Sequence, residues 1–200
     1  MKSSNKQKVL ELFERKKIVR PKDLEEINVD IKYLYLLLEE GAVQKIGEGL
    51  YTLQYFSMNE KFSLIRVSKR IPDGVFCLLT ALEFHEMTTQ IPHKVWIALE
   101  NSAYVPKVES VQLRVVRMSG DSLSAGISEY SIEGILAKIY TPAKTVADCF
   151  KFRNKIGLDI AIEALSDYIR DNRGTIDELW RYAKICRVQN ILRPYLEAMQ

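Results

Sequence analysis

Few residues of this chain have the types and spacing that enzyme chemistry requires. His85 and His93 are the two histidines, and no cysteine lies near either one, so neither a metal site nor a Cys–His pair is indicated. We expect His85 to be a hydrogen-bonded structural residue. The stretch Ser119-Gly120-Asp121-Ser122 has a nucleotidyltransferase-like Gly-Ser pair in reversed order, without a second carboxylate at D-x-D spacing to hold metal ions. We therefore expect no catalytic residues, no metal and no cofactor.

Other short motifs of nucleotide chemistry are also missing. Gly47-x-Gly49 lacks the third glycine and the strand-to-helix setting of a dinucleotide-binding loop. The E-x-K of Glu14-x-Lys16 falls at a predicted helix end, whereas a nuclease centre needs it on a strand beside another carboxylate. The cysteines form no C-x-x-C pair and stand among apolar residues, so we expect small buried side chains rather than disulfides or zinc ligands: Cys77, Cys149 and Cys186.

Composition and charge describe an ordinary globular protein. The chain has 200 residues, 47% of them hydrophobic, and a formal net charge of +3. There are ten basic and nine acidic residues in 1–56, ten of each in 57–150, and nine basic and seven acidic in 151–200. A surplus this small does not establish nucleic-acid binding. No run approaches the ~20 apolar residues of a membrane span, and the first residues, MKSSNKQK, have no apolar signal region. We expect a cytoplasmic protein that does not contact membranes.

The first 56 residues predict a winged helix-turn-helix. Ser3 or Ser4 can cap a first helix with apolar residues at helical spacing, and Pro21 can begin a short second helix. Asp30 can cap a third helix over 31–40, which Gly41 ends. Two short strands, 42–46 and 50–53, follow with glycines between them. In such a domain the third helix enters the major groove and the hairpin, or wing, touches phosphates.

Two uses of this unit remain open. Cations and tyrosines able to contact DNA are Arg20, Lys22, Lys32, Tyr33, Tyr35 and Lys45. However, the third helix, IKYLYLLLEE, is apolar on nearly every side, and arginine or lysine supplies most DNA affinity and the commonest specific contact. The same unit could instead be a protein-docking or dimerisation module.

Residues 57–200 predict an α+β domain, with a small mixed sheet backed by carboxy-terminal helices. Short apolar runs rich in β-formers predict strands, and amphipathic runs predict helices. The predicted strands are 75–79, 95–99, 111–117 and 135–140. The predicted helices are 61–70, 80–87, 143–154, 158–170 and 176–185, a helical turn within 119–127, and a last helix through Tyr195 and Met199.

The carboxy-terminal helices also bring a second set of cations. These cations either lie on a face that contacts only solvent or form a basic surface for an acidic partner or DNA backbone. They are Lys151, Arg153, Lys155, Arg181, Lys184, Arg187 and Arg193.

Several stretches resemble one protein family. PAKTVADCFKFRNKIGLD at 142–159 and DELWRYAKICRV at 177–188 resemble the carboxy-terminal domain of AbiEi-family antitoxins. TALEFHEMTTQIP at 80–92 and RPYLEAM at 193–199 are similar to the same family, as is the wing ending GLYTL at 49–53. Family members more often place arginine near the positions of Leu36, Glu40 and Glu48, where this chain departs from the pattern.

This resemblance implies the antitoxin and regulator half of an AbiE-type (type IV) toxin–antitoxin system of abortive infection. Such antitoxins repress their own operon through the winged helix, usually at inverted repeats in operator DNA. The carboxy-terminal domain antagonises a co-encoded nucleotidyltransferase toxin, and no stable complex with the toxin is expected. The alternatives are an orphan transcriptional regulator, a protein-docking module or, with less support, a degenerate nuclease-like enzyme.

Overall fold

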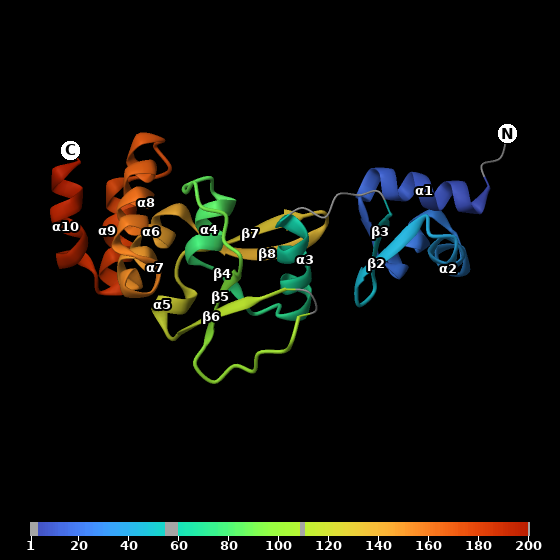
Figure 1. Ribbon diagram of the computed structural model, residues 1–200, viewed down its shortest axis with the longest axis horizontal. Coiled ribbons are helices and arrows are strands. Elements are labelled where there is room, and N and C mark those ends of the chain that lie inside the picture. Colours follow the sequence, from blue (N-terminus) through green and yellow to red (C-terminus); the bar gives the residue numbers. More distant parts are fainter. Residues whose placement is uncertain (1–3, 55–59, 109–110, 200) are drawn as a thin grey trace. The chain divides into compact units, whose positions relative to one another are not determined.

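The structure, a computed structural model, describes residues 4–54, 60–108 and 111–199 (Figure 1). Its contacts separate two compact units. Unit 1 is Met1–Arg66 with Ser131–Ile135, and unit 2 is Val67–Tyr130 with Leu136–Gln200. The boundary predicted between residues 56 and 57 falls in 55–59, outside the described residues.

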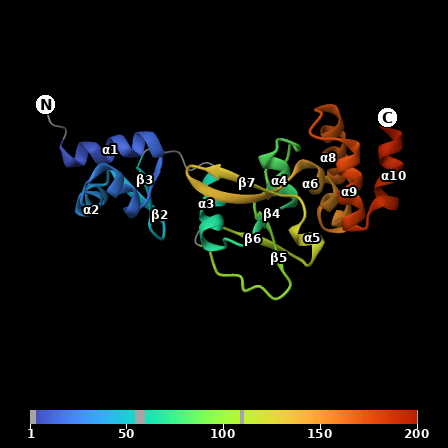
Figure 2. The ribbon, with the colours of Figure 1, turned by 180° about the vertical axis from the view of Figure 1, so that it is seen from behind.

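Unit 1 contains the helices and the hairpin predicted for the first 56 residues (Figure 2). The first helix begins as expected, because the Ser4 hydroxyl accepts a hydrogen bond from the Gln7 amide at 3.3 Å. The second helix is a 3₁₀ helix with Pro21 at its start. The elements of unit 1 are α1 (Asn5–Lys16), β1 (Ile18–Val19), η1 (Pro21–Ile27), α2 (Lys32–Glu39), β2 (Val43–Gly47) and β3 (Leu50–Leu53).

A small sheet and the helices of unit 1 enclose a core of their own. The strands lie in the order β1-β3-β2, and both pairs are antiparallel. Sequence patterning missed β1, because a two-residue strand shows no alternation. The core joins α1, α2 and the sheet through Val9, Leu12, Phe13, Val19, Leu24, Val29, Leu34, Leu37, Val43 and Tyr51.

Unit 2 is built on a mixed sheet, as predicted. The strands lie in the order β6-β5-β4-β8-β7; β4 pairs antiparallel with β5 and parallel with β8, and β5 pairs parallel with β6. The strands are β4 (Val75–Phe76), β5 (Val95–Glu100), β6 (Leu113–Met118), β7 (Ile127–Ile132) and β8 (Ile135–Tyr140).

Two details of this sheet differ from the prediction. The strand expected over 75–79 ends at Phe76, and α4 (Leu78–Phe84) begins where the strand was expected to continue. The chain turns there through Leu78, whose φ is +46°, and a continuous apolar run hides such a turn because buried strands and buried helices look alike. The strand β7 was missed because ISEYSI alternates with exposed apolar Ile127 and carries two serines.

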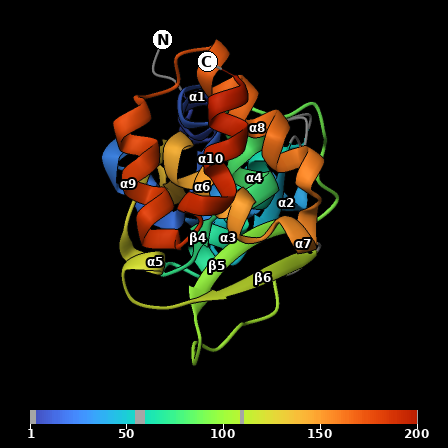
Figure 3. The ribbon, with the colours of Figure 1, turned by 90° about the vertical axis from the view of Figure 1, so that its left-hand side faces the viewer.

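The helices of unit 2 pack around α6 (Figures 1 and 3). This helix contacts α4, α8, α9 and α10. The helix expected over 143–154 is broken at Phe152 into α6 and α7. The bounds are α3 (Glu60–Arg70), which spans both units, α5 (Asp121–Ser124), α6 (Pro142–Lys151), α7 (Arg153–Ile156), α8 (Leu158–Arg170), α9 (Ile176–Cys186) and α10 (Gln189–Ala198).

Candidate functional site

The helix α2 has one buried side and one exposed side. Leu34 and Leu37 are buried in the core of unit 1. Ile31, Tyr35 and Leu36 keep 38%, 44% and 38% of their surface exposed. A helix that mainly contacts phosphates carries cations on its exposed side. The exposed side of α2 carries apolar side chains instead, and this distinguishes it from such a helix.

The exposed cations predicted to contact DNA come from three different elements of unit 1. Lys22 lies on η1, Lys32 is the first residue of α2, and Lys45 lies on β2, all with exposed side chains. The amide of Lys32 donates to the Asp30 carboxylate at 2.8 Å, which fixes the start of α2. These lysines leave their charged ends available to solvent and to a polyanion.

Arg20 differs from these lysines because a buried carboxylate holds its guanidinium. Its Nε and Nη2 donate to the two oxygens of Asp23 at 3.1 Å each, and Lys16 lies 3.3 Å from the same carboxylate. Burial raises the pKa of the Asp23 carboxyl, but the hydrogen bonds from Arg20 and Lys16 outweigh this and leave the pKa below its usual value. Arg20 therefore stabilises the start of η1 in addition to any contact with DNA.

The two tyrosines predicted for the site have different surroundings. Tyr33 is half-buried, and the Lys32 ammonium lies 5.3 Å from the centre of its ring. Tyr35 is exposed and meets the ring of buried Tyr51 edge to face at 6.5 Å. Tyr35 can therefore present its exposed ring to a partner without leaving its contact with the hairpin.

Carboxylates also border this surface. Glu39 and Glu40 are exposed at the end of α2, and Lys6 forms an ion pair with Glu40. Glu48 is exposed in the turn between β2 and β3. The outward face of α2 thus has a cation at its start and carboxylates at its end, with apolar side chains between them.

The second set of cations lies on α6, α7, α9 and α10 of unit 2. Lys151 donates to the Ser122 hydroxyl, and Arg153 donates to the Phe150 carbonyl oxygen at 2.9 Å. The ammonium groups of Lys151 and Lys155 both lie within 6 Å of the centre of the Phe152 ring, at 5.7 and 5.4 Å. The structure therefore gathers these two lysines around one aromatic ring.

The remaining cations of that set also lie against aromatic rings or cap a helix. Arg181 lies 4.8 Å from the centre of the Tyr182 ring, and Arg193 lies 5.8 Å from that of Trp180. Arg187 ends α9 in the left-handed conformation, with φ of +59°. Lys184 is exposed on the last turn of α9.

Sequence analysis missed a buried ion pair at the centre of unit 2. Lys144 and Asp148, both on α6 and fully buried, bring Nζ and Oδ2 to 2.5 Å. Lys144 Nζ lies 4.0 Å from the centre of the Tyr140 ring, and Cys186 on α9 donates through Sγ to Asp148 Oδ1 at 3.2 Å. The signal was available, because two opposite charges stand four residues apart in a helix that is otherwise mainly apolar.

This buried network ties α6 to α9 and to the end of β8. Burial raises the pKa of Asp148, although Lys144 acts in the opposite direction. Burial and the nearby Asp148 carboxylate raise the pKa of the Cys186 thiol to about 12. A protonated, buried thiol is a poor nucleophile, so the geometry favours a structural role.

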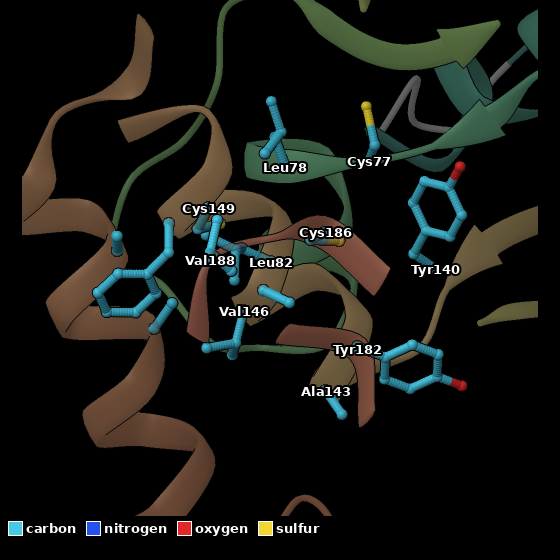
Figure 4. Close-up of a cluster of buried hydrophobic side chains, with 14 of the residues drawn as sticks. Cys77, Leu78, Leu82, Tyr140, Ala143, Val146, Cys149, Tyr182, Cys186 and Val188 are labelled. Atoms are coloured by element: carbon cyan, nitrogen blue, oxygen red, sulfur yellow. The ribbon is translucent and has the colours of Figure 1, made fainter. Parts of the chain in front are cut away.

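The cysteines and His85 have the surroundings expected from the sequence. Cys77, Cys149 and Cys186 are free and buried, and all belong to the same hydrophobic cluster (Figure 4). His85 Nε2 lies 2.7 Å from the Tyr140 carbonyl oxygen, which can only accept, so the ring donates there.

Metal-binding clusters and membrane-spanning helices are both absent from the described residues. Residues 4–54, 60–108 and 111–199 contain no group of three or more histidine, cysteine, aspartate or glutamate side chains placed to hold a metal ion. In the same part of the chain, no helix has the length and apolar composition needed to cross a bilayer.

A family model matches part of unit 1. Residues 7–54 match the family model described as "Transcriptional regulator, AbiEi antitoxin". No curated protein matches the chain. The matched residues run from within α1 to the residue after β3, and so they cover η1, α2 and the hairpin. The resemblance to AbiEi antitoxins and transcriptional regulators is thereby confirmed for the segment that carries the candidate DNA-contacting residues.

Proposed function

We propose that this chain is an AbiEi-type antitoxin that represses its own operon. Residues 1–56 act as a winged helix-turn-helix, with α2 as the recognition helix and the β2–β3 hairpin as the wing. Operator DNA, arranged as inverted repeats, is the partner of this unit in the cytoplasm. The observation that carries the proposal is the family match over 7–54, because it covers every element that the DNA-binding arrangement requires.

The charges of unit 1 support backbone contact more than base readout. Lys22, Lys32 and Lys45 are exposed on three elements, whereas α2 has only Lys32 as a cation. Phosphate contacts position a protein on DNA and supply affinity, while base contacts supply specificity. We therefore propose modest sequence discrimination, which Tyr33 and Tyr35 assist by bonding to phosphates or stacking.

The DNA-binding proposal is tested by titrating the purified chain with its own upstream DNA. A fluorescent duplex containing the inverted repeats is compared with a scrambled duplex of equal length at several salt concentrations. We expect both to bind at low salt and the upstream duplex to bind more tightly. If neither duplex binds at low salt, α2 is a docking surface and the regulator proposal is wrong.

We further propose that residues 57–200 antagonise a co-encoded nucleotidyltransferase toxin without forming a stable complex with it. The support is the resemblance of residues 80–92, 142–159, 177–188 and 193–199 to the antitoxin domain of the family. The cations on α6, α7, α9 and α10 provide a surface for an acidic partner or a nucleic-acid backbone. A neighbouring reading frame with G-S and D-x-D motifs is expected. Without such a frame, an orphan regulator becomes the better account.

The proposed function includes no catalysis. Purified chain should show no nuclease or transferase turnover that depends on a divalent metal, because the sequence has no carboxylates at the D-x-D spacing that holds such ions. The assay uses nucleic acid and nucleotide substrates with Mg²⁺ or Mn²⁺. Activity that survives stringent purification and disappears on mutation of one acidic residue would contradict the proposal.

A further inference from the structure

The outward face of α2 carries both apolar and charged side chains in an ordered pattern. The exposed residues at the start of the helix and along it recur at intervals of one, three and four, which places them on one side. They are Ile31, Lys32, Tyr35, Leu36, Glu39 and Glu40. We call these six residues the α2 face.

Two charges of this face, those of Lys32 and Glu39, lie on its midline, whereas Glu40 lies at its edge and forms an ion pair with Lys6. Lys32 and Glu39 are seven residues apart, which is about 20° short of two helical turns. They therefore lie almost directly above one another along the helix. Tyr35 and Leu36 lie between them, one on each side of that line. The face has a cation at one end, a carboxylate at the other and an apolar centre.

We propose that the α2 face binds a second copy of itself, with the two helices antiparallel. A two-fold axis at the midpoint between Tyr35 and Leu36 places Lys32 of each copy opposite Glu39 of the other. The same axis brings the exposed Tyr35 and Leu36 side chains of both copies together at the centre. One surface thus supplies both halves of a complementary interface.

Charge complementarity favours a second copy of the α2 face as the partner and an antiparallel arrangement of the two helices. A parallel pair would place Lys32 beside Lys32 and Glu39 beside Glu39, which is repulsive. Among the residues that the structure describes, neither Lys32 nor Glu39 has an ion-pair partner within the chain. Antiparallel helices also place the positive end of each dipole beside the negative end of the other.

The size of the face sets the expected strength. A helix of eight residues is about 12 Å long, so the contact lies at the small end of protein interfaces. We expect a dissociation constant weaker than about 1 µM. Because Lys32 and Tyr35 are also proposed DNA contacts, the self-associated form and the DNA-bound form exclude each other.

The test is sedimentation of the full chain without DNA, from low micromolar to several hundred micromolar. The wild-type chain should pass from monomer to dimer. Lys32→Glu and Glu39→Lys should each weaken association about tenfold, because each turns two attractive contacts into two repulsive ones. The double variant Lys32→Glu/Glu39→Lys restores opposite charges across the two-fold axis and should recover wild-type association.

Controls separate the interface from general charge effects. Lys107→Glu makes the same change of charge at an exposed position of unit 2 and should not alter association. Leu36→Ser, which removes an exposed apolar side chain, should abolish dimerisation in the same range. Circular dichroism confirms that every variant remains folded.

Three outcomes would overturn the inference. They are a wild-type chain that stays monomeric, a Lys32→Glu variant that associates as well as the wild type, and a double variant that fails to recover. Because no DNA is present, these outcomes are independent of the DNA titration that tests the proposed function.

Discussion

Asp23 and Asp148 are both carboxylates held by a lysine, yet water reaches only one of the two networks. Lys16 and Arg20, which hold Asp23, keep 29% and 28% of their side-chain surface exposed. Lys144 and Asp148 are fully buried. Water therefore screens the charges of the first network. The charges of the second are compensated inside the protein, by each other, by the Cys186 thiol and by the Tyr140 ring.

The Asp23 network should make the stability of unit 1 depend on pH. Because the folded-state pKa of Asp23 lies below the ordinary aspartate value, its stabilisation is complete above about pH 4 and is lost as the pH falls through the folded value. Asp23→Asn should cost roughly 1.5–3 kcal/mol at pH 7, and this deficit should shrink as the pH falls below about 4. Calorimetry at several pH values measures it. A deficit that stays constant with pH would contradict this assignment.

The buried pair of unit 2 should respond more strongly to loss of one partner than to loss of both. Lys144→Met leaves the Asp148 carboxylate buried without its cation and should cost about 3–5 kcal/mol. Lys144→Met/Asp148→Leu should recover most of that loss. Urea unfolding followed by tryptophan fluorescence reports on unit 2, because Trp96 and Trp180, the two tryptophans of the chain, both lie there. Equal losses in the single and double variants would contradict the prediction.

The single variant also has a pH signature. Without Lys144, the largest effect that opposes the burial is lost, and the pKa of Asp148 should rise further. The folded chain should then take up a proton more readily than the unfolded chain, and the deficit of Lys144→Met should decrease as the pH falls. Unfolding curves at pH 5 and pH 8 measure this difference.

At the scale of elements, α2 is the one whose chemistry departs most from its proposed role. It keeps the length and position of a recognition helix, but Lys32 is its one cation, and the middle of its exposed side carries Tyr35 and Leu36. Sequence readout by such a helix should be weak. Affinity should instead come from lysines on η1, α2 and β2 that reach the phosphates.

The salt dependence of DNA binding measures how much of the affinity comes from phosphate contacts. Three lysines in each of two protomers imply a slope of log affinity against log salt of roughly −5. Lys32→Ala should weaken binding to every sequence and flatten the slope by about one unit per site. The control is Lys107→Ala, an exposed lysine of unit 2. Loss of sequence preference with unchanged non-specific binding would instead show that Lys32 reads a base.

At the scale of the whole molecule, each unit has its own hydrophobic core. This organisation supports separate tasks for the amino-terminal and carboxy-terminal parts of the chain. Residues 57–200, expressed alone with the toxin, should restore bacterial growth. Full-length chain is the positive control, and residues 1–56 are the negative control. Rescue by the full-length chain alone would show that the two tasks are not separable.

Local signals in the sequence located most of the elements. The Ser4 hydroxyl accepts a hydrogen bond from the Gln7 amide, as its position before an amphipathic run predicted. Helical periodicity identified α1, α8 and α9, and glycine ended α2. These features are local because a cap or an apolar stripe depends on residues within a few positions of one another.

Contacts between distant residues were decided only by the tertiary structure. The strand β1 exists because Ile18 and Val19 pair with Thr52 and Tyr51. No pattern in the local sequence predicts that pairing. The apolar run at 75–79 divides between β4 and α4 because of a turn at Leu78. Sequence periodicity cannot resolve a turn inside a run that is buried throughout.

The same distinction holds for the candidate sites. The sequence by itself determined which cations and tyrosines unit 1 can offer to DNA, because residue type and helix register fix which side chains share a face. Only the tertiary structure decided that Arg20 is held by Asp23 and that Asp148 meets Cys186 from α9, thirty-eight residues further along the chain. A charge has no partner until folding brings one within hydrogen-bond distance, and burial then determines how strongly the two interact.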